Sequence, residues 1–336
     1  MKKLLSILLI LLIICGCASS KAKDSFDGKD RPSNRGKLQV IDAQLCGADG
    51  QPVVLRGISG NGIPMVDRYV NNDTFKEISE FMGANVFRLA LYTYGVGTVG
   101  YCTEGNKAQL KQTVENGVEY AKNNDMYVII DWHVLDEGDP NRFIEEAKIF
   151  FDEESAKYKD YDNVIYEICN EPNNVEWKDI KQYAETIIPV IRNNDPKALI
   201  IVGTPDWSKN VDVAAEDPLD FDNILYTLHF YSASHKQELR DKAKKALDKG
   251  IGLFVTEFGI TSSNGDLPLD VEEADIWIDF LEENKISYVM WQFSKVGEAS
   301  AVLKFDVLKT KEFTRDDFKT AGTWLIDKIA EKSAKE

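Results

Sequence analysis

The chain has 336 residues, of which 43% are hydrophobic and 29% charged, a balance that excludes a disordered or collagen-like protein. Its 40 Lys and Arg against 56 Asp and Glu give a formal net charge of −16. Such a surface disfavours nucleic acid and anionic polymers as partners and suits a neutral polymer. Five cysteines are too few for a disulfide scaffold.

Residues 1–16 have the pattern of a bacterial lipoprotein signal peptide. Two lysines precede a run over residues 4–14 that is apolar except for Ser6 and is too short to span a bilayer. The run leads into I-C-G-C at residues 14–17, which resembles a lipobox with lipid attachment at Cys17. Ordinary secretion with an unmodified cysteine is the alternative. We therefore expect an extracytoplasmic protein at the bacterial cell surface that meets the membrane through this N-terminal lipid, or a secreted one.

Residues 17–36 are rich in Ser, Lys, Asp, Gly and Pro and nearly free of apolar residues, which predicts a flexible tether. The remaining residues, 37–336, are expected to form one domain. It begins with a short hairpin over residues 37–54 and ends with a helix from about residue 316.

From about residue 53, apolar runs alternate with helical patterns. The runs have near-continuous β-branched cores, as expected for parallel strands buried on both faces; they cover residues 53–59, 85–92, 127–133, 164–170, 199–204, 224–231, 253–258 and 286–293. Patterns with one apolar helical face lie between most of them, at residues 107–124, 143–159, 177–194, 236–249 and 271–284. Eight such units predict an α/β fold, the (β/α)8 TIM barrel. A doubly wound sheet is the alternative, but residues 57–62 lack its G-x-G-x-x-G turn.

Two carboxylates stand at predicted strand ends, where barrels of this kind carry their active groups. Glu171 closes the fourth run and Glu257 the seventh. Glycoside hydrolysis requires such a pair, with one acid for the leaving oxygen and one group to meet the cationic anomeric carbon. The alternative is that either glutamate is a structural ion-pair partner of Arg56 or Arg88.

Other chemistries lack their motifs. No H-E-x-x-H, C-x-x-C or G-x-S-x-G sequence occurs, so we expect no metal site, no cofactor and no serine nucleophile. Aromatic residues at strand ends predict a surface for sugar rings; they are Trp132, Trp207, Tyr231 and Trp291. Trp177 and Trp277 lie in helical patterns and are expected to be packing residues.

Ordered segments at the strand ends carry a family pattern: Arg88, Asp131–Val134, Ile165–Pro172, Gly203–Ser208, Tyr226–Tyr231 and Val255–Gly259. Together they resemble glycoside hydrolase family 5, in its bacterial endo-β-1,4-glucanase (cellulase) branch. The similarity runs from about Gly36 to about Leu308, which is nearly the whole predicted mature chain.

The resemblance implies a retaining double displacement on β-1,4-glucosidic bonds of cellulose or related β-glucans, with Glu171 as acid/base and Glu257 as nucleophile. It implies that the substrate is held by Asn61, Arg88, His133, Asn170, Trp207, His229, Tyr231, Trp291 and Glu298. Retention predicts carboxyl groups about 5–5.5 Å apart. A neighbouring cation and phenol should keep Glu257 ionised, whereas Glu171 should have a raised pKa. We expect a monomer.

The chain departs from the family pattern around the first and last strands. Asn61 stands in a Ser-Gly-Asn-Gly segment, Met65 replaces an aromatic residue, Phe258 follows the second carboxylate, and Lys295 is displaced by one position. The catalytic pair is intact, so the subsites away from the cut are what these changes affect. Mixed-linkage glucan, xyloglucan or mannan therefore remain alternative substrates. A non-catalytic surface glycan-binding lipoprotein remains the alternative of a different class.

Overall fold

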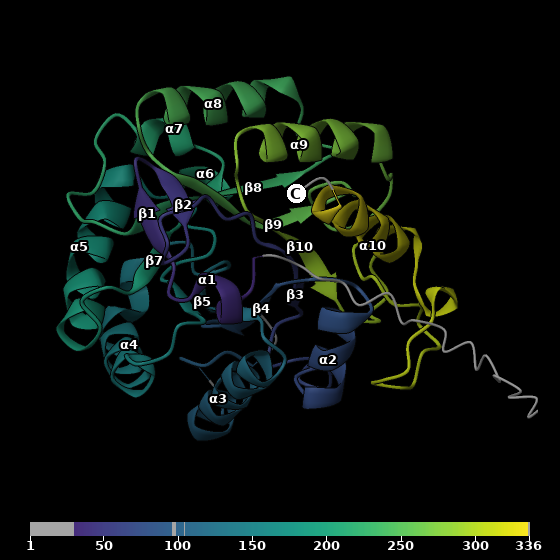
Figure 1. The fold of residues 1–336 in the computed structure, drawn as a ribbon. Helices are drawn as coiled ribbons and strands as arrows, with labels where there is room; N and C mark the ends of the chain where they lie inside the picture. Colours follow the sequence, from purple (N-terminus) through teal and green to yellow (C-terminus); the bar gives the residue numbers. More distant parts are fainter. Residues whose placement is uncertain (1–29, 96–98, 104, 335–336) are drawn as a thin grey trace, which may run out of the picture.

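The computed structural model describes residues 30–95, 99–103 and 105–334. Eight parallel strands close into a barrel in the order β10-β3-β4-β5-β6-β7-β8-β9, with helices packed around it (Figure 1). The predicted signal peptide, Cys17 and most of the predicted tether lie outside the described residues. Within the described part, no helix has the length and apolar content to cross a membrane, and Cys46, Cys102 and Cys169 are free thiols.

The eight predicted strands are all present. They are β3 (Arg56–Gly60), β4 (Val86–Tyr92), β5 (Tyr127–His133), β6 (Val164–Glu167), β7 (Leu199–Val202), β8 (Ile224–Tyr231), β9 (Leu253–Gly259) and β10 (Tyr288–Phe293). Every residue in them except Tyr92 is buried. Burial on both faces is the reason that each strand reads as a continuous apolar run.

The helices of the outer layer follow the strands in alternation. The longer ones are α2 (Asn72–Glu80), α3 (Lys107–Asn123), α4 (Ile144–Tyr158), α5 (Trp177–Asn194), α8 (Gln237–Asp248), α9 (Val271–Glu283) and α10 (Thr320–Ser333). Single turns complete the layer: α6 (Pro205–Ser208), α7 (Val211–Ala214) and the 3-10 turns η1 (Pro140–Phe143) and η2 (Arg315–Asp317). The predicted final helix starts at Thr320 rather than near residue 316, because η2 comes first.

The apolar core has two layers. The larger cluster lies between the strands and the surrounding helices. A smaller cluster fills the barrel near the N-terminal ends of the strands with side chains such as Val86, Ile129 and Val289. Leu38 and Leu45 of the N-terminal hairpin belong to the same cluster. That hairpin, predicted over residues 37–54, consists of β1 (Gln39–Ile41) and β2 (Gln44–Cys46). We call this end, at the N-terminal ends of the strands, the floor, and the opposite end the mouth.

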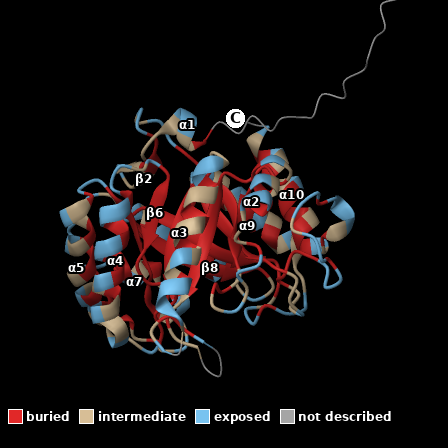
Figure 2. Cartoon of the chain, turned by 90° about the horizontal axis from the view of Figure 1, so that it is seen from below, coloured by how far each residue is buried: buried red, intermediate tan, exposed pale blue. Residues whose placement is uncertain are grey.

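Residues 30–36 belong to the floor and not to a tether, so the predicted boundary at residue 36 is wrong. Asp30 is buried, accepts the Val54 amide at 2.9 Å and pairs with Arg35 at 2.7 Å. Arg31 is buried as well and donates to the Ser79 hydroxyl at 2.8 Å. The helix α1 (Pro32–Arg35) lies with β2 at one end of the barrel (Figure 2). The polar composition of this stretch serves buried contacts rather than solvation.

Strand β9 carries one residue more than its neighbours. Residues 227–229 of β8 face residues 254–257 of β9, and β10 shows the same excess on the other side. This β-bulge interrupts the alternation of side chains along the strand. As a result, the consecutive residues Thr256 and Glu257 both reach groups inside the barrel with their side chains.

Candidate active site

A buried ionic cluster fills the barrel beneath the mouth, with Arg88 of β4 at its centre. The guanidinium donates to Glu167 at 2.7 Å and to Asn170 at 2.6 Å, and it pairs with Asp131 at 2.9 Å and Glu257 at 3.3 Å. Burial alone would lower the pKa of Arg88, but the three carboxylates raise it above its ordinary value. Arg88 is therefore a permanent cation that fixes the groups around it.

Glu257 is held from two sides. The Tyr231 hydroxyl donates to Oε1 at 2.6 Å, and Arg88 donates to Oε2 at 3.3 Å, so the contacts expected from the sequence are present. Burial and the neighbouring Glu171 nevertheless raise the pKa of Glu257, and Arg88 opposes this shift without reversing it. The sequence predicted an ionised Glu257. Both donors do stabilise the anion, but the raised pKa favours the protonated form more than that prediction allowed.

Glu171 lies at the mouth, just past the end of β6. Its Oε1 is 2.8 Å from Nδ1 of His229, and its backbone amide donates to the carbonyl of Val134. Burial raises the pKa of Glu171 to about 8, against the opposing charges of Arg88 and Lys209. The carboxyl group therefore keeps its proton at neutral pH, as the sequence predicted for a general acid.

The two glutamates are close. One oxygen of Glu171, one oxygen of Glu257 and one ring nitrogen of His229 all lie within 4.8 Å of one another. Among the residues that the structure describes, this is the one cluster compact enough for a metal ion. Because Glu257 already accepts from Arg88 and Tyr231, and a guanidinium on that carboxylate opposes a second cation, we assign no metal ligand here.

His133 forms the middle of an aromatic stack in the cleft. Its ring centroid lies 4.0 Å from that of Tyr92 and 5.6 Å from that of Trp291, with near-parallel planes. Its Nδ1 is 2.6 Å from Asp131, which leaves Nε2 to accept from the Asn170 amide at 3.2 Å. Burial lowers the pKa of His133 to about 3, so the ring is neutral.

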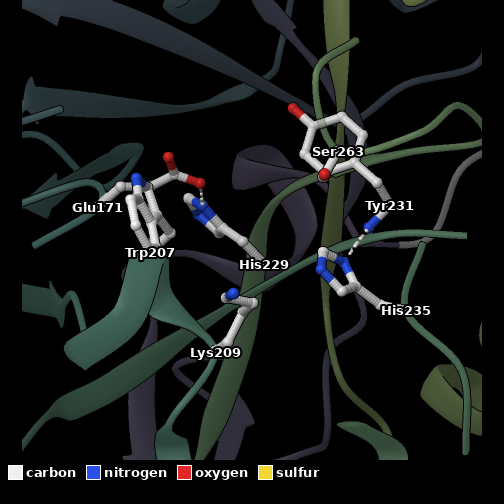
Figure 3. Close-up of a pocket in the computed structure, with 7 residues that line it drawn as sticks. All are labelled: Glu171, Trp207, Lys209, His229, Tyr231, His235 and Ser263. Atoms are coloured by element: carbon white, nitrogen blue, oxygen red, sulfur yellow. Dashed lines mark hydrogen bonds and ion pairs between the residues drawn. The ribbon is translucent and has the colours of Figure 1, made fainter. Parts of the chain in front are cut away.

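Two connected hollows form the cleft at the mouth. The larger, of about 540 Å³, is lined by Asn61, Tyr92, His133, Trp291 and Glu298 among others; the smaller, of about 280 Å³, is lined by Lys209, His229 and His235 among others (Figure 3). Both hollows share Glu171, Trp207 and Tyr231. The cleft therefore passes the acid on both sides, which leaves room for a sugar chain on either side of the cut.

Trp207 stands on the rim with 41% of its surface exposed. Asp206, Trp207 and Ser208 have left-handed backbones with φ of 61°, 57° and 55°. The Trp207 amide donates to the carbonyl of Pro172, which ties this turn to the loop that carries Glu171. The Lys209 ammonium lies 5.3 Å from the centre of the indole ring.

Most of the predicted site residues line the cleft, and two lie beneath it. Asn61, His133, Trp207, His229, Tyr231, Trp291 and Glu298 join the two glutamates in the hollows. Arg88 and Asn170, expected to bind substrate, are fully buried, and the Asn170 amide is used by His133 and the Val134 carbonyl. In this structure they position other groups rather than face a ligand.

The expectation that Trp132 lines the rim is wrong, and Arg56 is no partner of the two glutamates. Trp132 is fully buried outside the barrel, with its ring 5.2 Å from Phe150. Asp131 and His133 point inward, so the residue between them points out to the helices. Arg56 lies at the floor and pairs with Glu282 at 2.7 Å. Trp177 and Trp277 are buried packing residues, as expected.

Sequence reasoning missed several residues of the site: Tyr92, Glu167, Lys209, His235 and Thr256. Glu167 could have been found, because it is a charged residue in a run that is otherwise apolar, and burying a charge demands a partner. Thr256 gave no such signal, since threonine is common in strands.

A (β/α)8 barrel whose mouth carries two glutamates this close, one proton-bearing and one held by a cation and a phenol, belongs to the class of glycoside hydrolases. The comparison with known proteins narrows the class. The pattern of the Cellulase family (glycosyl hydrolase family 5) matches residues 46–297. The chain belongs to this family, and the predictions of family and fold are confirmed.

Two endoglucanases match most of the chain. It is 45% identical to Endoglucanase A of Butyrivibrio fibrisolvens over 88% of this chain and 69% of that protein, and 40% identical to an endoglucanase of Clostridium saccharobutylicum over 97% and 71%. Its fold matches the catalytic domain of Thermobifida fusca endoglucanase Cel5A in complex with cellotetraose, with a TM-score of 0.85 and 34% identity over 89% of this chain and 99% of that one.

Proposed function

We propose that the chain is a retaining endo-β-1,4-glucanase that cuts within cellulose or related β-glucans. The observation that carries the proposal is the spacing of Glu171 and Glu257, whose nearest oxygens lie within 4.8 Å in a cleft open past both sides of the acid. Retaining enzymes place their carboxyl groups about 5–5.5 Å apart and inverting ones about 6.5–9.5 Å. The predicted class of enzyme, an endoglucanase, is confirmed by the family and by endoglucanases 40–45% identical to this chain.

In the first step Glu171 acts as the acid. Its proton passes to the glycosidic oxygen as the bond from that oxygen to the anomeric carbon breaks, and Glu257 forms an ester bond to the same carbon. The protonated state of Glu171, whose pKa burial raises to about 8, suits this role. Tyr231 and Arg88 hold the carboxylate of Glu257 in place before the attack.

In the second step Glu171 acts as the base. Its carboxylate takes a proton from a water molecule, whose oxygen attacks the anomeric carbon, and the ester bond to Glu257 breaks. The carboxylate released from the ester returns to its donors Tyr231 and Arg88. Two inversions at one carbon preserve the β configuration of the product.

The rest of the cleft holds the polymer. Trp291 offers a ring to the sugar on the non-reducing side of the cut, and the exposed ring of Trp207 borders both hollows beside Glu171. Asn61, Met65 and Glu298 line the larger hollow. Met65 is 42% exposed and offers a flexible thioether where a flat ring would bind sugar more firmly, which keeps mixed-linkage glucan, xyloglucan and mannan as alternative substrates.

Reducing-sugar release tests this proposal. Protein lacking residues 1–20 is incubated with carboxymethyl cellulose, barley β-glucan, xyloglucan and glucomannan, beside its Glu257→Gln variant. Activity on cellulose and β-glucan that disappears in Glu257→Gln supports the endoglucanase. Activity confined to xyloglucan or mannan redirects the substrate assignment. Binding without release on every substrate would overturn the proposal in favour of a glycan-binding protein.

We also propose that the protein is a monomer anchored by lipid on Cys17 at the bacterial cell surface. The basic, apolar and I-C-G-C segments of residues 1–17 support the anchor. Metabolic labelling with a tagged fatty acid tests it, since label on the full chain and none on Cys17→Ser is expected. Label on neither, with the protein in the medium, would support plain secretion instead. Light scattering of the soluble part tests the monomer.

A further inference from the structure

A chain of hydrogen bonds runs from the ionic cluster to the acid. The Thr256 hydroxyl contacts three groups at once: it is 2.7 Å from Oε1 of Glu167, 2.9 Å from Nε2 of His229, and hydrogen-bonded to the Thr227 hydroxyl. His229 continues the chain through Nδ1, which is 2.8 Å from Oε1 of Glu171. All five residues are buried.

The number of available hydrogens determines which group donates in each of these hydrogen bonds. Glu167 accepts from Arg88 at 2.7 Å and 3.3 Å, so it is an ion-paired carboxylate and can only accept. The single hydrogen of Thr256 must therefore go to Glu167. Nε2 of His229 then has to donate to Thr256, since that oxygen has no second hydrogen to offer.

The tautomer of His229 determines whether the proton between Nδ1 and Glu171 belongs to the ring or to the carboxyl group. Burial lowers the pKa of His229 to about 4, so the ring is neutral and carries one hydrogen, which is on Nε2. Nδ1 is then a bare acceptor. Its short contact with Glu171 requires the hydrogen to be on the carboxyl group, because an anion there would face a lone pair.

We propose that Thr256 and Glu167 are positioning residues that lock His229 in the Nε2–H tautomer and thereby keep the acid Glu171 protonated until a glycosidic oxygen replaces Nδ1 as its acceptor. The proposal rests on the proposed function, because it assigns a device to the acid of that reaction. The bulge in β9 makes the device possible, since it brings the side chain of Thr256 into the barrel beside that of Glu257.

The lock also serves the second step. Once Glu171 has given up its proton, its carboxylate faces the lone pair of Nδ1 and receives no hydrogen bond from His229. An anion without that donor is a stronger base toward the incoming water. A histidine free to carry its hydrogen on Nδ1 would instead stabilise the anion and weaken both roles of Glu171.

Titratable groups, some charged and some neutral, surround Glu171 at the mouth, and they set the background for any test. The groups are Arg88 and Tyr92 from β4, Asp131 and His133 from β5, Glu167 from β6, Lys209 from the loop after α6, His229 and Tyr231 from β8, and Glu257 from β9. Arg88 and Lys209 favour the anion of Glu171, and the carboxylates of Asp131 and Glu167 favour its acid form. A substitution at Thr256 removes no charge from this set, so its effect reports the tautomer.

The test is Thr256→Val, which keeps the shape and removes the hydroxyl. His229 can then carry its hydrogen on Nδ1 and donate to ionised Glu171, so the pKa of Glu171 falls. The alkaline limb of kcat/KM on cellotetraose is expected to move at least about half a pH unit lower, with a loss of about tenfold or more at pH 7. On 2,4-dinitrophenyl cellobioside, whose leaving group needs no proton, the loss is expected to stay within about threefold.

Three comparisons make the result decisive. Thr256→Ser restores the hydroxyl and should restore the alkaline limb, and Thr74→Val, a buried change in α2 outside the cleft, should match the parent. Glu171→Gln should fail on cellotetraose and keep kcat/KM on the dinitrophenyl substrate. If it fails on neither substrate, the acid role itself is wrong. If it behaves as expected while Thr256→Val matches the parent on both substrates, the tautomer lock alone is overturned.

A direct observation covers the case in which Thr256→Val does not fold. The chain has three histidines, so a nitrogen-15 histidine spectrum of protein without a histidine tag is assigned with two variants, His229→Gln and His235→Gln. At pH 7 the signals of His229 should show hydrogen on Nε2 and a bare Nδ1. Hydrogen on Nδ1 would overturn the proposal.

Discussion

The hydroxyl of Tyr231 lies 2.6 Å from Oε1 of Glu257, and the two residues come from adjacent strands, β8 and β9. Their strands run in register there, with Tyr231 opposite Gly259 and His229 opposite Glu257. Burial and Glu257 itself raise the pKa of Tyr231 well above its ordinary value, so the phenol remains a donor throughout the working pH range. This hydrogen bond orients the carboxylate of Glu257 through Oε1 and leaves that group with lone pairs for the attack on the anomeric carbon.

We expect Tyr231→Phe to lower kcat/KM on cellotetraose by about 10- to 100-fold, because a hydrogen bond to a charged group contributes about 1.5–3 kcal/mol. Tyr161→Phe is the matched control. Its hydroxyl donates to Glu119 at 2.7 Å on the outer face, away from the cleft, and its removal should leave kcat/KM near that of the parent. Equal rates for both variants would contradict the role given to Tyr231.

Glu257→Gln should abolish hydrolysis of barley β-glucan, with a loss of at least about 10³-fold, because an amide cannot form the ester intermediate. The structure offers Glu145→Gln as a control, since that side chain is 74% exposed in α4. The measurement is initial reducing-sugar release at equal protein concentration, with melting curves to show that both variants fold. Residual activity within tenfold of the parent would exclude Glu257 as the nucleophile.

The first anomer released should be β. The separation within 4.8 Å leaves no room for a water molecule between the glutamates and the sugar, so the product of a double displacement is expected. Proton NMR of cellotetraose hydrolysis in its first minutes measures the anomer before mutarotation. An initial α product would mean inversion and would rule out a glycosyl ester on Glu257.

The pH profile of kcat/KM should be bell-shaped. Glu171 must be protonated, and because burial raises its pKa to about 8, activity should fall as the pH rises through that value. Glu257 must be ionised, and because burial and Glu171 raise its pKa, the acid limb should lie above the ordinary carboxyl range. In Glu171→Gln, assayed with dinitrophenyl cellobioside, the alkaline limb should vanish. A limb that persists there belongs to another group.

Asp30→Ala should lower the free energy of unfolding by about 2–3 kcal/mol, because it strips the buried Val54 amide of its acceptor and Arg35 of its partner. Asp49→Ala is its control. That carboxylate also pairs with Arg35, at 3.1 Å, but is half-exposed, so the change should cost less than about 1 kcal/mol. Urea unfolding measures both. Equal small effects would show that residues 30–35 add little to the fold.

The strands were predictable because burial on both faces turns each into an apolar run. Their C-terminal ends alone indicated Glu171 and Glu257 as the candidate catalytic pair. The helix α2 was missed, because its nine residues carry just two large buried apolar side chains, Phe75 and Ile78. Trp132 was predicted at the rim because the alternation of side chains along a strand was overlooked. With Asp131 and His133 pointing into the barrel, the residue between them must point out to the helices.

The hydrogen-bond network of the site could not have been predicted from sequence. It depends on the register of neighbouring strands and on the bulge in β9, for which residues 254–257 carry no glycine or other local signal. The floor segment was misjudged for a similar reason. Asp30 and Arg31 have the composition of a solvated linker, and the partners that bury them lie at Val54 and Ser79, far along the chain.

Because Asp30 and Arg31 are clamped to the floor, the described part of the chain begins at the end of the barrel opposite the mouth. Anything joined ahead of Asp30, whether an acyl chain in a membrane, a fused module or a bead, is attached at the base of the barrel. An attachment there does not cover the groove that Trp207 and Trp291 line. A glucan strand too long to diffuse freely can then be cut by an array of immobilised barrels, because their attachment does not block their clefts.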